Sequence, residues 1–324
     1  MTGIVLAVHG GAGRLARRKR EHPKRLVYEE GLKQALQAGH TVLRKGGSSL
    51  NAVTKAVSIL EDIEVFNAGL GAALCADGSV ELSASIMSGK DLSVGAMVGL
   101  SRAKNPIRAA RTIMGHAHGL LFGRHADAYA EAKGLDMVQP DYFFTRERLR
   151  QWEKYKASKR IALDHDEDSA HGTVGAVALD RRGNLAAATS TGGLVNQLPG
   201  RVGDTPVIGA GTWAQNGVCA ISATGKGDAF ARVAFARRVA DLIEIGDMAP
   251  LEAAHEALNA VARVSGEGGC IIIDASGQCF MPFNSKHMLR GLIREDGVPH
   301  VAITVDDFDH SSEDKFGVGA ESSR

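Results

Sequence analysis

The sequence of 324 residues contains only four cysteines and no apolar run long enough to cross a membrane. None of the cysteines belongs to a Cys-x-x-Cys pair or has a histidine at zinc-binding spacing, so we expect buried free thiols in a reducing compartment. A membrane-spanning helix needs about 20 apolar residues. Residues 1–8 lack the basic leader and the long apolar region of a signal peptide. These absences predict a soluble, cytoplasmic protein that does not bind membranes.

The sequence also lacks an excess of charge of either sign. The 38 basic and 37 acidic residues give a formal net charge of +1, so no overall field attracts nucleic acid or an acidic surface. A basic cluster lies between Arg14 and Arg25, but no aromatic residues that could stack on bases accompany it. We therefore expect a solvent-exposed loop there and no nucleic-acid partner. The hydrophobic fraction of 44% is enough for a sizeable core without disulfides.

The most informative stretch is residues 171–175 (His-Gly-Thr-Val-Gly), which places Thr173 at the start of an apolar strand. Cleavage before Thr173 would free an α-amine that can activate the threonine hydroxyl as a nucleophile. A Gly-Thr pair before a strand is also an ordinary loop-to-strand junction, so this pattern alone does not decide. Strands at 174–180 and 185–190, joined by a turn at 181–184, predict a hairpin that returns Thr191 to the side of Thr173.

Further motifs flank this stretch in a fixed order along the chain. They are residues 8–13 (Val-His-Gly-Gly-Ala-Gly), 66–71 (Phe-Asn-Ala-Gly-Leu-Gly), 189–193 (Thr-Ser-Thr-Gly-Gly), 199–204 (Pro-Gly-Arg-Val-Gly-Asp) and 223–225 (Ala-Thr-Gly). Together with residues 171–175 they resemble the plant-type asparaginases and isoaspartyl peptidases, a family of N-terminal-nucleophile hydrolases. The resemblance covers roughly residues 3–135 and 171–305.

The resemblance implies an α+β fold, in the form of a four-layer αββα sandwich. It also implies autocleavage between Gly172 and Thr173. The products would be an α subunit of residues 1–172, with a linker at about 135–172, and a β subunit of residues 173–324, which together form one domain. Two copies of each subunit would assemble as an (αβ)₂ heterotetramer. Residues 306–324 are polar and acidic, and we expect a disordered tail there.

The resemblance assigns Thr173 as the nucleophile, with the Thr191 hydroxyl beside it. The Thr224 hydroxyl and the Gly225 N–H are candidates to stabilise an anionic tetrahedral intermediate, and Asn67 is the remaining catalytic candidate. Each has a structural alternative. Thr191 could simply stabilise a turn, and Thr-Gly could simply open a helix.

Arg201 and Asp204 are candidates to bind the head of a free amino acid. The arginine fork matches an α-carboxylate with two hydrogen bonds, and the aspartate can hold an α-ammonium group. This pair fits L-asparagine and β-aspartyl dipeptides, although a surface ion pair is the alternative. Two other functions stay open. One is a hydrolase for glycosylated asparagine or for a protein cleavage site, and the other is an uncleaved, catalytically silent binding or scaffold protein.

In the resembling family, the loop after the second helix wraps an alkali cation with backbone carbonyls, which suit hard ions. Carried over to this sequence, the carbonyls are those of Leu60, Glu61, Ile63, Phe66, Ala68 and Leu70. A plain structured loop is the alternative, so we expect no required cofactor, with a structural sodium ion as the one candidate ion. His116, His118 and His125 have no accompanying carboxylate pattern, which favours surface or packing histidines over a metal site.

Hydrophobic periodicity predicts the remaining elements. We expect strands at 4–8, 71–76, 79–86 and 94–100, with residues 10–13 as a flexible turn and a hairpin turn at 76–79. Helices are expected at about 24–44, from Ser48 or Ser49 to Leu60, at 146–157, at 250–264, and as one long helix from Gly225 to Ile243. Later strands are expected at 212–215, 218–222, 270–274, 278–281 and 300–305.

Overall fold

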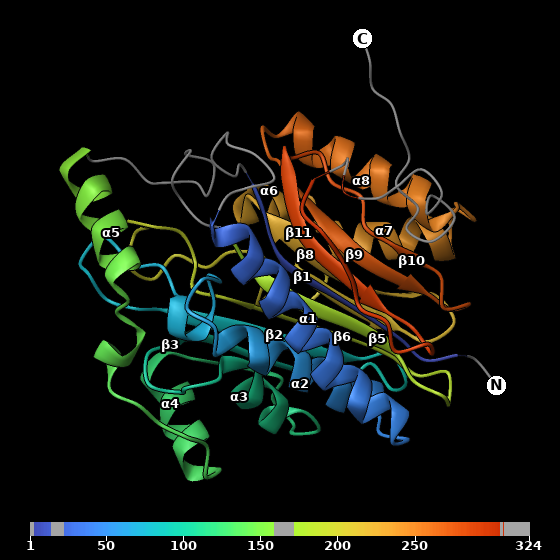
Figure 1. Cartoon of the computed structure of the whole chain (residues 1–324), viewed down its shortest axis with the longest axis horizontal. Helices are drawn as coiled ribbons and strands as arrows, with labels where there is room; N and C mark the ends of the chain where they lie inside the picture. Colours follow the sequence, from blue (N-terminus) through green and yellow to red (C-terminus); the bar gives the residue numbers. More distant parts are fainter. Residues whose placement is uncertain (1–2, 14–22, 159–171, 305–306, 308–324) are drawn as a thin grey trace.

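The computed structural model describes residues 3–13, 23–158, 172–304 and 307 (Figure 1). Most of the basic cluster, part of the expected linker and nearly all of the expected tail lie outside these residues. Within the described chain, the strands form two sheets. The larger has the order β12-β11-β1-β5-β6-β2-β3-β4 and the smaller the order β10-β9-β8-β7. Neighbouring strands run antiparallel, except for the parallel pair β3 and β4.

The strands come from both halves of the chain. The larger sheet consists of β1 (Val5–Gly13), β2 (Leu82–Ser88), β3 (Val94–Leu100), β4 (Leu120–Phe122), β5 (Val174–Leu179), β6 (Leu185–Thr191), β11 (His287–Ile293) and β12 (His300–Ala302). The smaller sheet consists of β7 (Thr212–Gln215), β8 (Cys219–Gly225), β9 (Gly268–Asp274) and β10 (Cys279–Phe280).

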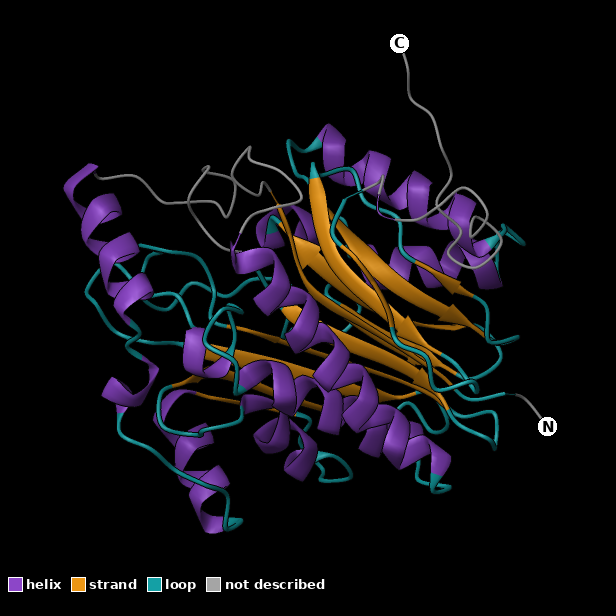
Figure 2. Cartoon of the chain, in the orientation of Figure 1, coloured by secondary structure: helices purple, strands orange, loops and turns teal. Residues whose placement is uncertain are grey.

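Helices cover the outer face of each sheet, and the two sheets contact each other through their inner faces. The larger sheet is covered by α1 (Pro23–Arg44), α2 (Ser49–Glu61), α3 (Pro106–Ile113) and α4 (Gly123–Ala132). The smaller sheet is covered by α7 (Phe235–Glu244) and α8 (Pro250–Arg263), preceded by the short α6 (Gly227–Arg232). Helix α5 (Arg146–Ser158) lies at one side, away from the sheets (Figure 2). The layers therefore follow the order helix, sheet, sheet, helix, which confirms the expected α+β fold.

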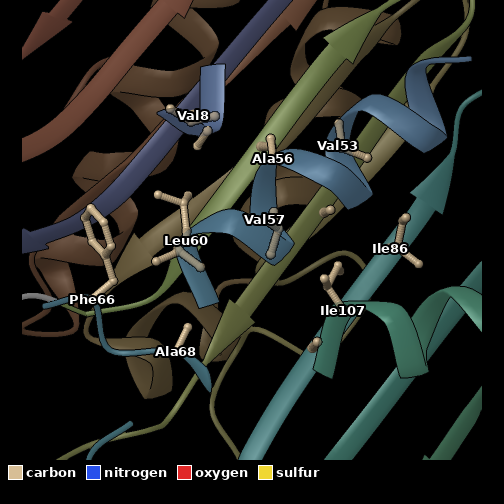
Figure 3. Close-up of a cluster of buried hydrophobic side chains, with 14 of the residues drawn as sticks. Val8, Val53, Ala56, Val57, Leu60, Phe66, Ala68, Ile86 and Ile107 are labelled. Carbon is tan, nitrogen blue, oxygen red and sulfur yellow. The ribbon is translucent and has the colours of Figure 1, made fainter. Parts of the chain in front are cut away.

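Helices α1 and α2 form where their sequence signals predict. The Ser48 hydroxyl caps α2 by accepting a hydrogen bond from the Asn51 N–H. The end of α1 is closed by Gly46, at φ +79°, and the Gly47 N–H donates to the Val42 carbonyl. The apolar side of α2, which carries Val53, Ala56, Val57 and Leu60, packs into the core over the larger sheet (Figure 3).

Strand alternation decides which side chains reach the space between the sheets. In β5, Val174, Ala176 and Ala178 belong to the core under the helices, whereas Val177 and Leu179 belong to the core between the sheets. Both faces of this strand are buried, which explains its continuous apolar sequence. By the same period of two, Gly175 and Thr173 face the space between the sheets.

Several expected elements are wrong. Residues 10–13 are part of β1, not a turn, and pair with β11 after an irregularity between His9 and Gly11. The bare Gly10 leaves room for the Phe66 ring, which a Cβ there would approach to 2.5 Å. No strand forms at 71–76, where a hydrogen bond from the Cys75 N–H to the Ser79 carbonyl closes a turn only.

The prediction of one long helix from Gly225 to Ile243 is also wrong. Gly225 ends β8, and the helical residues divide into α6 and α7 at Ala234, whose φ of +49° no continuous helix tolerates. Strand β11 was not expected. It is nevertheless the direct neighbour of β1 in the larger sheet.

The described chain can be compared with the predictions about cysteines and membrane-spanning helices. All four cysteines are buried and free, as expected. None of the described helices is long and apolar enough to cross a membrane.

Candidate active site

Thr173 lies directly before β5, with only 6% of its surface exposed. The hairpin of β5 and β6 has the predicted register, because Val174 pairs with Ser190 and thus places Thr191 next to Thr173. The Thr173 hydroxyl donates a hydrogen bond of 3.2 Å to the Thr191 hydroxyl. The Thr191 oxygen also accepts from the Gly193 N–H at 3.1 Å, so the same side chain stabilises the following turn. The two interpretations of Thr191 are therefore compatible.

A third hydroxyl, that of Thr205, lies 3.5 Å from the Thr173 oxygen. Thr205 is 1% exposed and directly follows Asp204. The loop that carries Arg201 and Asp204 therefore reaches the candidate nucleophile through its next residue. Sequence reasoning missed Thr205 because the recognised motif ends at Asp204, although a threonine adjoining that motif was a signal.

Behind Thr173, buried polar side chains connect the two sheets. His9 of β1 is fully buried, and its Nε2 lies 2.8 Å from the hydroxyl of Ser222 on β8. Ser222 in turn lies 2.8 Å from the hydroxyl of Thr189 on β6. Burial lowers the pKa of His9 to about 3, so its imidazole is neutral at physiological pH.

The same chain of hydroxyls continues toward Thr205. Thr189 lies 2.5 Å from the hydroxyl of Thr212, which receives a 2.8 Å hydrogen bond from Ser85. The Ser85 hydroxyl is also 2.5 Å from the carbonyl of Thr205. All of these side chains are at most 1% exposed. The network therefore joins five strands to the loop beside Thr173 without burying a net charge, since its only titratable group, His9, is neutral.

Gly175 has a geometric reason to be glycine. It pairs with His9 in the larger sheet and faces Ser222 of the other sheet. A Cβ on Gly175 would overlap both the His9 Nε2 and the Ser222 Oγ. The glycine two residues after Thr173 therefore makes space for the hydrogen bond between His9 and Ser222.

Arg201 and Asp204 lie together, but Arg201 makes its ion pair with a different residue. Its Nη2 donates to the Asp228 carboxylate at 2.6 Å, and its Nη1 lies 3.4 Å from the Gln197 side-chain oxygen. A Cβ on Gly227 would be 2.6 Å from Asp204 Oδ1 and 3.1 Å from Arg201 Nη2, so both groups converge on Gly227. The alternative of a surface ion pair between Arg201 and Asp204 is wrong, because Asp204 is 4% exposed.

Two polar atoms of this pair are buried without a hydrogen-bond partner among the described residues: Asp204 Oδ2 and Arg201 Nε. Burial raises the pKa of Asp204 to about 7, although the nearby positive charge of Arg201 acts in the opposite direction. Unsatisfied buried groups of both charges are costly unless a ligand pairs with them. The arrangement is suited to a small zwitterion.

Thr224 and Gly225 lie at the end of β8, next to the Gly227 contact. The Thr224 hydroxyl is fully buried and lacks a hydrogen-bond partner among the described residues. Gly225 adopts φ +142°, and a Cβ there would lie 2.5 Å from the Gly268 Cα. The helix that follows has only six residues, so the dipole of a long helix does not support this end of the site.

Asn67 braces the turn behind Thr191. Its amide nitrogen donates to the Gly193 carbonyl at 2.6 Å, and its side-chain oxygen accepts from the Ala73 N–H at 2.8 Å. The Asn67 carbonyl also accepts from the Gly192 N–H. These contacts give Asn67 a positioning task, whereas its catalytic assignment stays a prediction.

The loop proposed to hold a cation has an oxygen-rich interior. A Cβ on Gly69 would overlap the Glu61 carbonyl oxygen, and one on Gly71 would overlap that of Phe66. The carbonyls of Leu60, Ile63 and Ala68 accept only long backbone hydrogen bonds of 3.2–3.4 Å. Backbone carbonyls with spare lone pairs are the ligand type that suits an alkali cation. Among the described residues, no group of three or more His, Cys, Asp or Glu could hold a metal ion, and this includes His116, His118 and His125.

Comparison with known proteins identifies the family of this chain. The sequence profile of the asparaginase family matches residues 2–303. The chain belongs to the asparaginase family. It is 42% identical over 297 residues to the isoaspartyl peptidase of Salmonella typhimurium, covering 90% of this chain and 95% of that protein. It is 40% identical over 301 residues to the isoaspartyl peptidase/L-asparaginase of Xenopus laevis, covering 92% and 94%. The resemblance inferred from the motifs is confirmed.

Within this asparaginase-family chain, sequence reasoning missed His9, Thr205 and Asp228 as neighbours of the site. His9 stood within a recognised motif, and a lone histidine among buried strand residues was the available signal. Asp228 gave no signal of its own, because its contact with Arg201 joins positions 27 residues apart.

Proposed function

We propose that this protein is an N-terminal-nucleophile hydrolase with the αββα fold of that class. It cleaves itself between Gly172 and Thr173, and then hydrolyses L-asparagine to L-aspartate and ammonia and cleaves β-aspartyl dipeptides. Its membership in the asparaginase family supports this proposal, as do relatives named isoaspartyl peptidase and L-asparaginase.

One observation carries the proposal. The buried Thr173 hydroxyl lies within hydrogen-bond distance of Thr191, and the loop that reaches it through Thr205 also carries Arg201 and Asp204. A nucleophile candidate and a receptor for a charged amino-acid head therefore belong to one site. A loop-to-strand junction without catalytic use would not need this combination.

In the proposed reaction, the Thr173 hydroxyl attacks the side-chain carbonyl carbon of the substrate. The free α-amine of Thr173 accepts the hydroxyl proton and later returns it to the leaving amine. The Thr224 hydroxyl and the Gly225 N–H are proposed to donate to the anionic oxygen of the tetrahedral intermediate. The unpartnered, buried state of the Thr224 hydroxyl supports this role. Water then hydrolyses the acyl-enzyme and releases aspartate.

Arg201 and Asp204 are proposed to fix the α-carboxylate and the α-ammonium of the substrate. This requirement explains why the scissile bond is on the side chain, since both α groups stay free in asparagine and in β-aspartyl dipeptides. A charge-assisted hydrogen bond contributes about 1.5–3 kcal/mol, so the head group can supply much of the binding energy.

Two further parts of the proposal concern support of the site. An alkali cation would be held by the carbonyls of Leu60, Glu61, Ile63, Phe66, Ala68 and Leu70. The Glu61 carboxylate ties this loop to β6 and α3 through Ser190 and the Ile107 N–H. The cleaved chains assemble as an (αβ)₂ heterotetramer, which is an expectation carried from the family.

Intact mass spectrometry of purified protein tests the self-cleavage. We expect two fragments, residues 1–172 and 173–324, and a single uncut chain for Thr173→Ala, because the nucleophile is lost. Thr41→Ala is the matched control, since Thr41 is an exposed threonine of α1, and it should cleave like the wild type. An uncut wild-type chain after long incubation would instead favour the catalytically silent alternative.

Substrate choice is tested on the cleaved protein. Ammonia release from L-asparagine and leucine release from β-Asp-Leu should both be observed, and both should be absent with Thr173→Ala. Activity on neither compound would reject the proposed substrates while leaving the self-cleavage result intact.

A further inference from the structure

Arg201 forms an ion pair with a carboxylate of the protein itself. Its Nη2 contacts Asp228 Oδ2 at 2.6 Å, where the Arg201 side chain is 16% exposed and that of Asp228 is 53% exposed. Asp228 lies in the first turn of α6, whereas Arg201 lies in the loop before β7. The guanidinium proposed to receive the substrate's α-carboxylate therefore holds a carboxylate of the protein itself.

The contact occurs inside the proposed head-group site. Arg201 Nη2 and Asp204 Oδ1 both approach Gly227, the residue before Asp228. Arg201 thus has two carboxylates of different character nearby. Asp204 is buried and has an oxygen without a hydrogen-bond partner among the described residues, whereas Asp228 is half exposed and pairs with Arg201.

A zwitterionic head brings one more carboxylate and one ammonium to these three groups. The ammonium can pair with the buried Asp204. The added carboxylate must share or replace the partner of Arg201, and the half-exposed Asp228 is the group that water can solvate after it leaves. Water could not solvate Asp204 in this way, because its side chain is buried.

We infer that Asp228 is a specificity-determining residue that occupies Arg201 in place of the substrate's α-carboxylate and is displaced when substrate binds. This inference rests on the proposed function. Asp228 keeps the arginine fork paired until substrate binds. A ligand without an α-carboxylate cannot replace Asp228 at Arg201, so the pair persists and that ligand gains nothing from the arginine.

Asp228→Asn tests the inference in the cleaved enzyme. The amide removes the competing charge at nearly constant size, so we expect the KM for L-asparagine to fall about two- to fivefold, as suits an exposed ion pair. The change in kcat should be smaller than the change in KM. Asp241→Asn is the matched control, because Asp241 forms a comparably exposed ion pair with Arg237 on α7, and its KM should equal that of the wild type.

A ligand pair separates competition from a general effect on the loop. L-Aspartate, which keeps the α-carboxylate, should inhibit Asp228→Asn about two- to fivefold more strongly than the wild type. The compound 3-aminopropanamide, which is asparagine without its α-carboxylate, should inhibit both equally. An unchanged or higher KM in Asp228→Asn, a loss of kcat in the cleaved variant, or an equal gain for both inhibitors would overturn the inference.

Failure of the proposed function would give a different result. If the wild type hydrolyses neither L-asparagine nor β-Asp-Leu, the substrates are wrong, and calorimetric binding of L-aspartate then tests Asp228 directly. The variant should still bind L-aspartate more tightly than the wild type. Equal binding, or no binding by either protein, would reject the role of Asp228.

Discussion

The two sides of the candidate site differ in the charge of their side chains. Around Thr173, the neighbouring groups are neutral hydroxyls, and the chain from His9 to Ser85 behind them is also uncharged at physiological pH. Around Arg201, the neighbouring groups are carboxylates, and polar atoms there are left without partners among the described residues. On the first side each hydroxyl has a hydrogen-bond partner, and His9 Nδ1 is the one polar side-chain atom of that chain buried without a partner among the described residues. The second side is arranged for a ligand.

This difference follows from what burial costs. Neutral hydroxyls can be buried cheaply if each one has a hydrogen-bond partner, and they then fix strands relative to each other. Charged groups that must pair with a substrate cannot be fully satisfied beforehand without losing the gain on binding. The nucleophile side therefore depends on strand packing, whereas the recognition side depends on a loop and the start of a short helix. Mutations on the two sides should separate stability from binding.

The largest expected effect comes from Gly175→Ala on the nucleophile side. The new Cβ would overlap His9 Nε2 and Ser222 Oγ, both of which are buried between the sheets. Overpacking and the loss of the hydrogen bond between His9 and Ser222 should lower the free energy of unfolding by about 3 kcal/mol or more. Because Gly175 is two residues from Thr173, self-cleavage should also be slowed at least tenfold. Chemical denaturation and a time course of intact mass measure the two effects.

The control for this prediction is Gly3→Ala. Gly3 has no atom within 4 Å of the added Cβ, so both the stability and the cleavage rate should match the wild type. If Gly175→Ala cleaved and unfolded like the Gly3 variant, the hydroxyl network would have no part in fixing Thr173.

A smaller effect, confined to binding, is expected from Asp204→Asn on the recognition side. The amide keeps the shape but loses the charge that pairs with the α-ammonium, so KM for L-asparagine should rise about 10- to 100-fold. The fold should not be weakened, because Asp204 has an unpartnered buried oxygen and its ionised form is costly. KM and the denaturation midpoint check both parts of the prediction. A clear loss of stability would show that Asp204 serves the fold as well as the ligand.

The sequence predicted the local part of this comparison well. The hairpin of β5 and β6 and the placement of Thr191 next to Thr173 follow from strand alternation and a turn, which are short-range signals. The start of α2 at Ser48 and the end of α1 near Arg44 were predicted for the same reason. The order of the motifs correctly indicated the family. The motif at 199–204 also correctly predicted that Arg201 and Asp204 lie close together.

The contacts between distant segments could not be predicted. His9, Ser222 and Thr189 meet only because the two sheets stack, and no periodicity in one strand reports on another sheet. Local residue preference gave a wrong prediction at glycines and also at an alanine. Residues 10–13 look like a turn but continue β1 because the missing side chains admit Phe66, whereas an ordinary alanine, Ala234, interrupts the expected long helix. In each case tertiary packing overrode local propensity.

The smallest expected effect is the pH dependence of the recognition side. Burial raises the pKa of Asp204 to about 7, and only the ionised carboxylate pairs with an ammonium group. Protonation below pH 7 should therefore weaken L-aspartate binding, by about fivefold between pH 7 and pH 6. The sign for folding is opposite. The folded protein keeps this proton to higher pH than the unfolded chain, so Asp204 makes the free energy of unfolding fall as pH rises from about 4 to about 7. Calorimetric titrations from pH 5 to pH 8 should show the binding trend in the wild type and not in Asp204→Asn. A trend that persists in the variant would assign the titration to another group, such as the α-amine of Thr173.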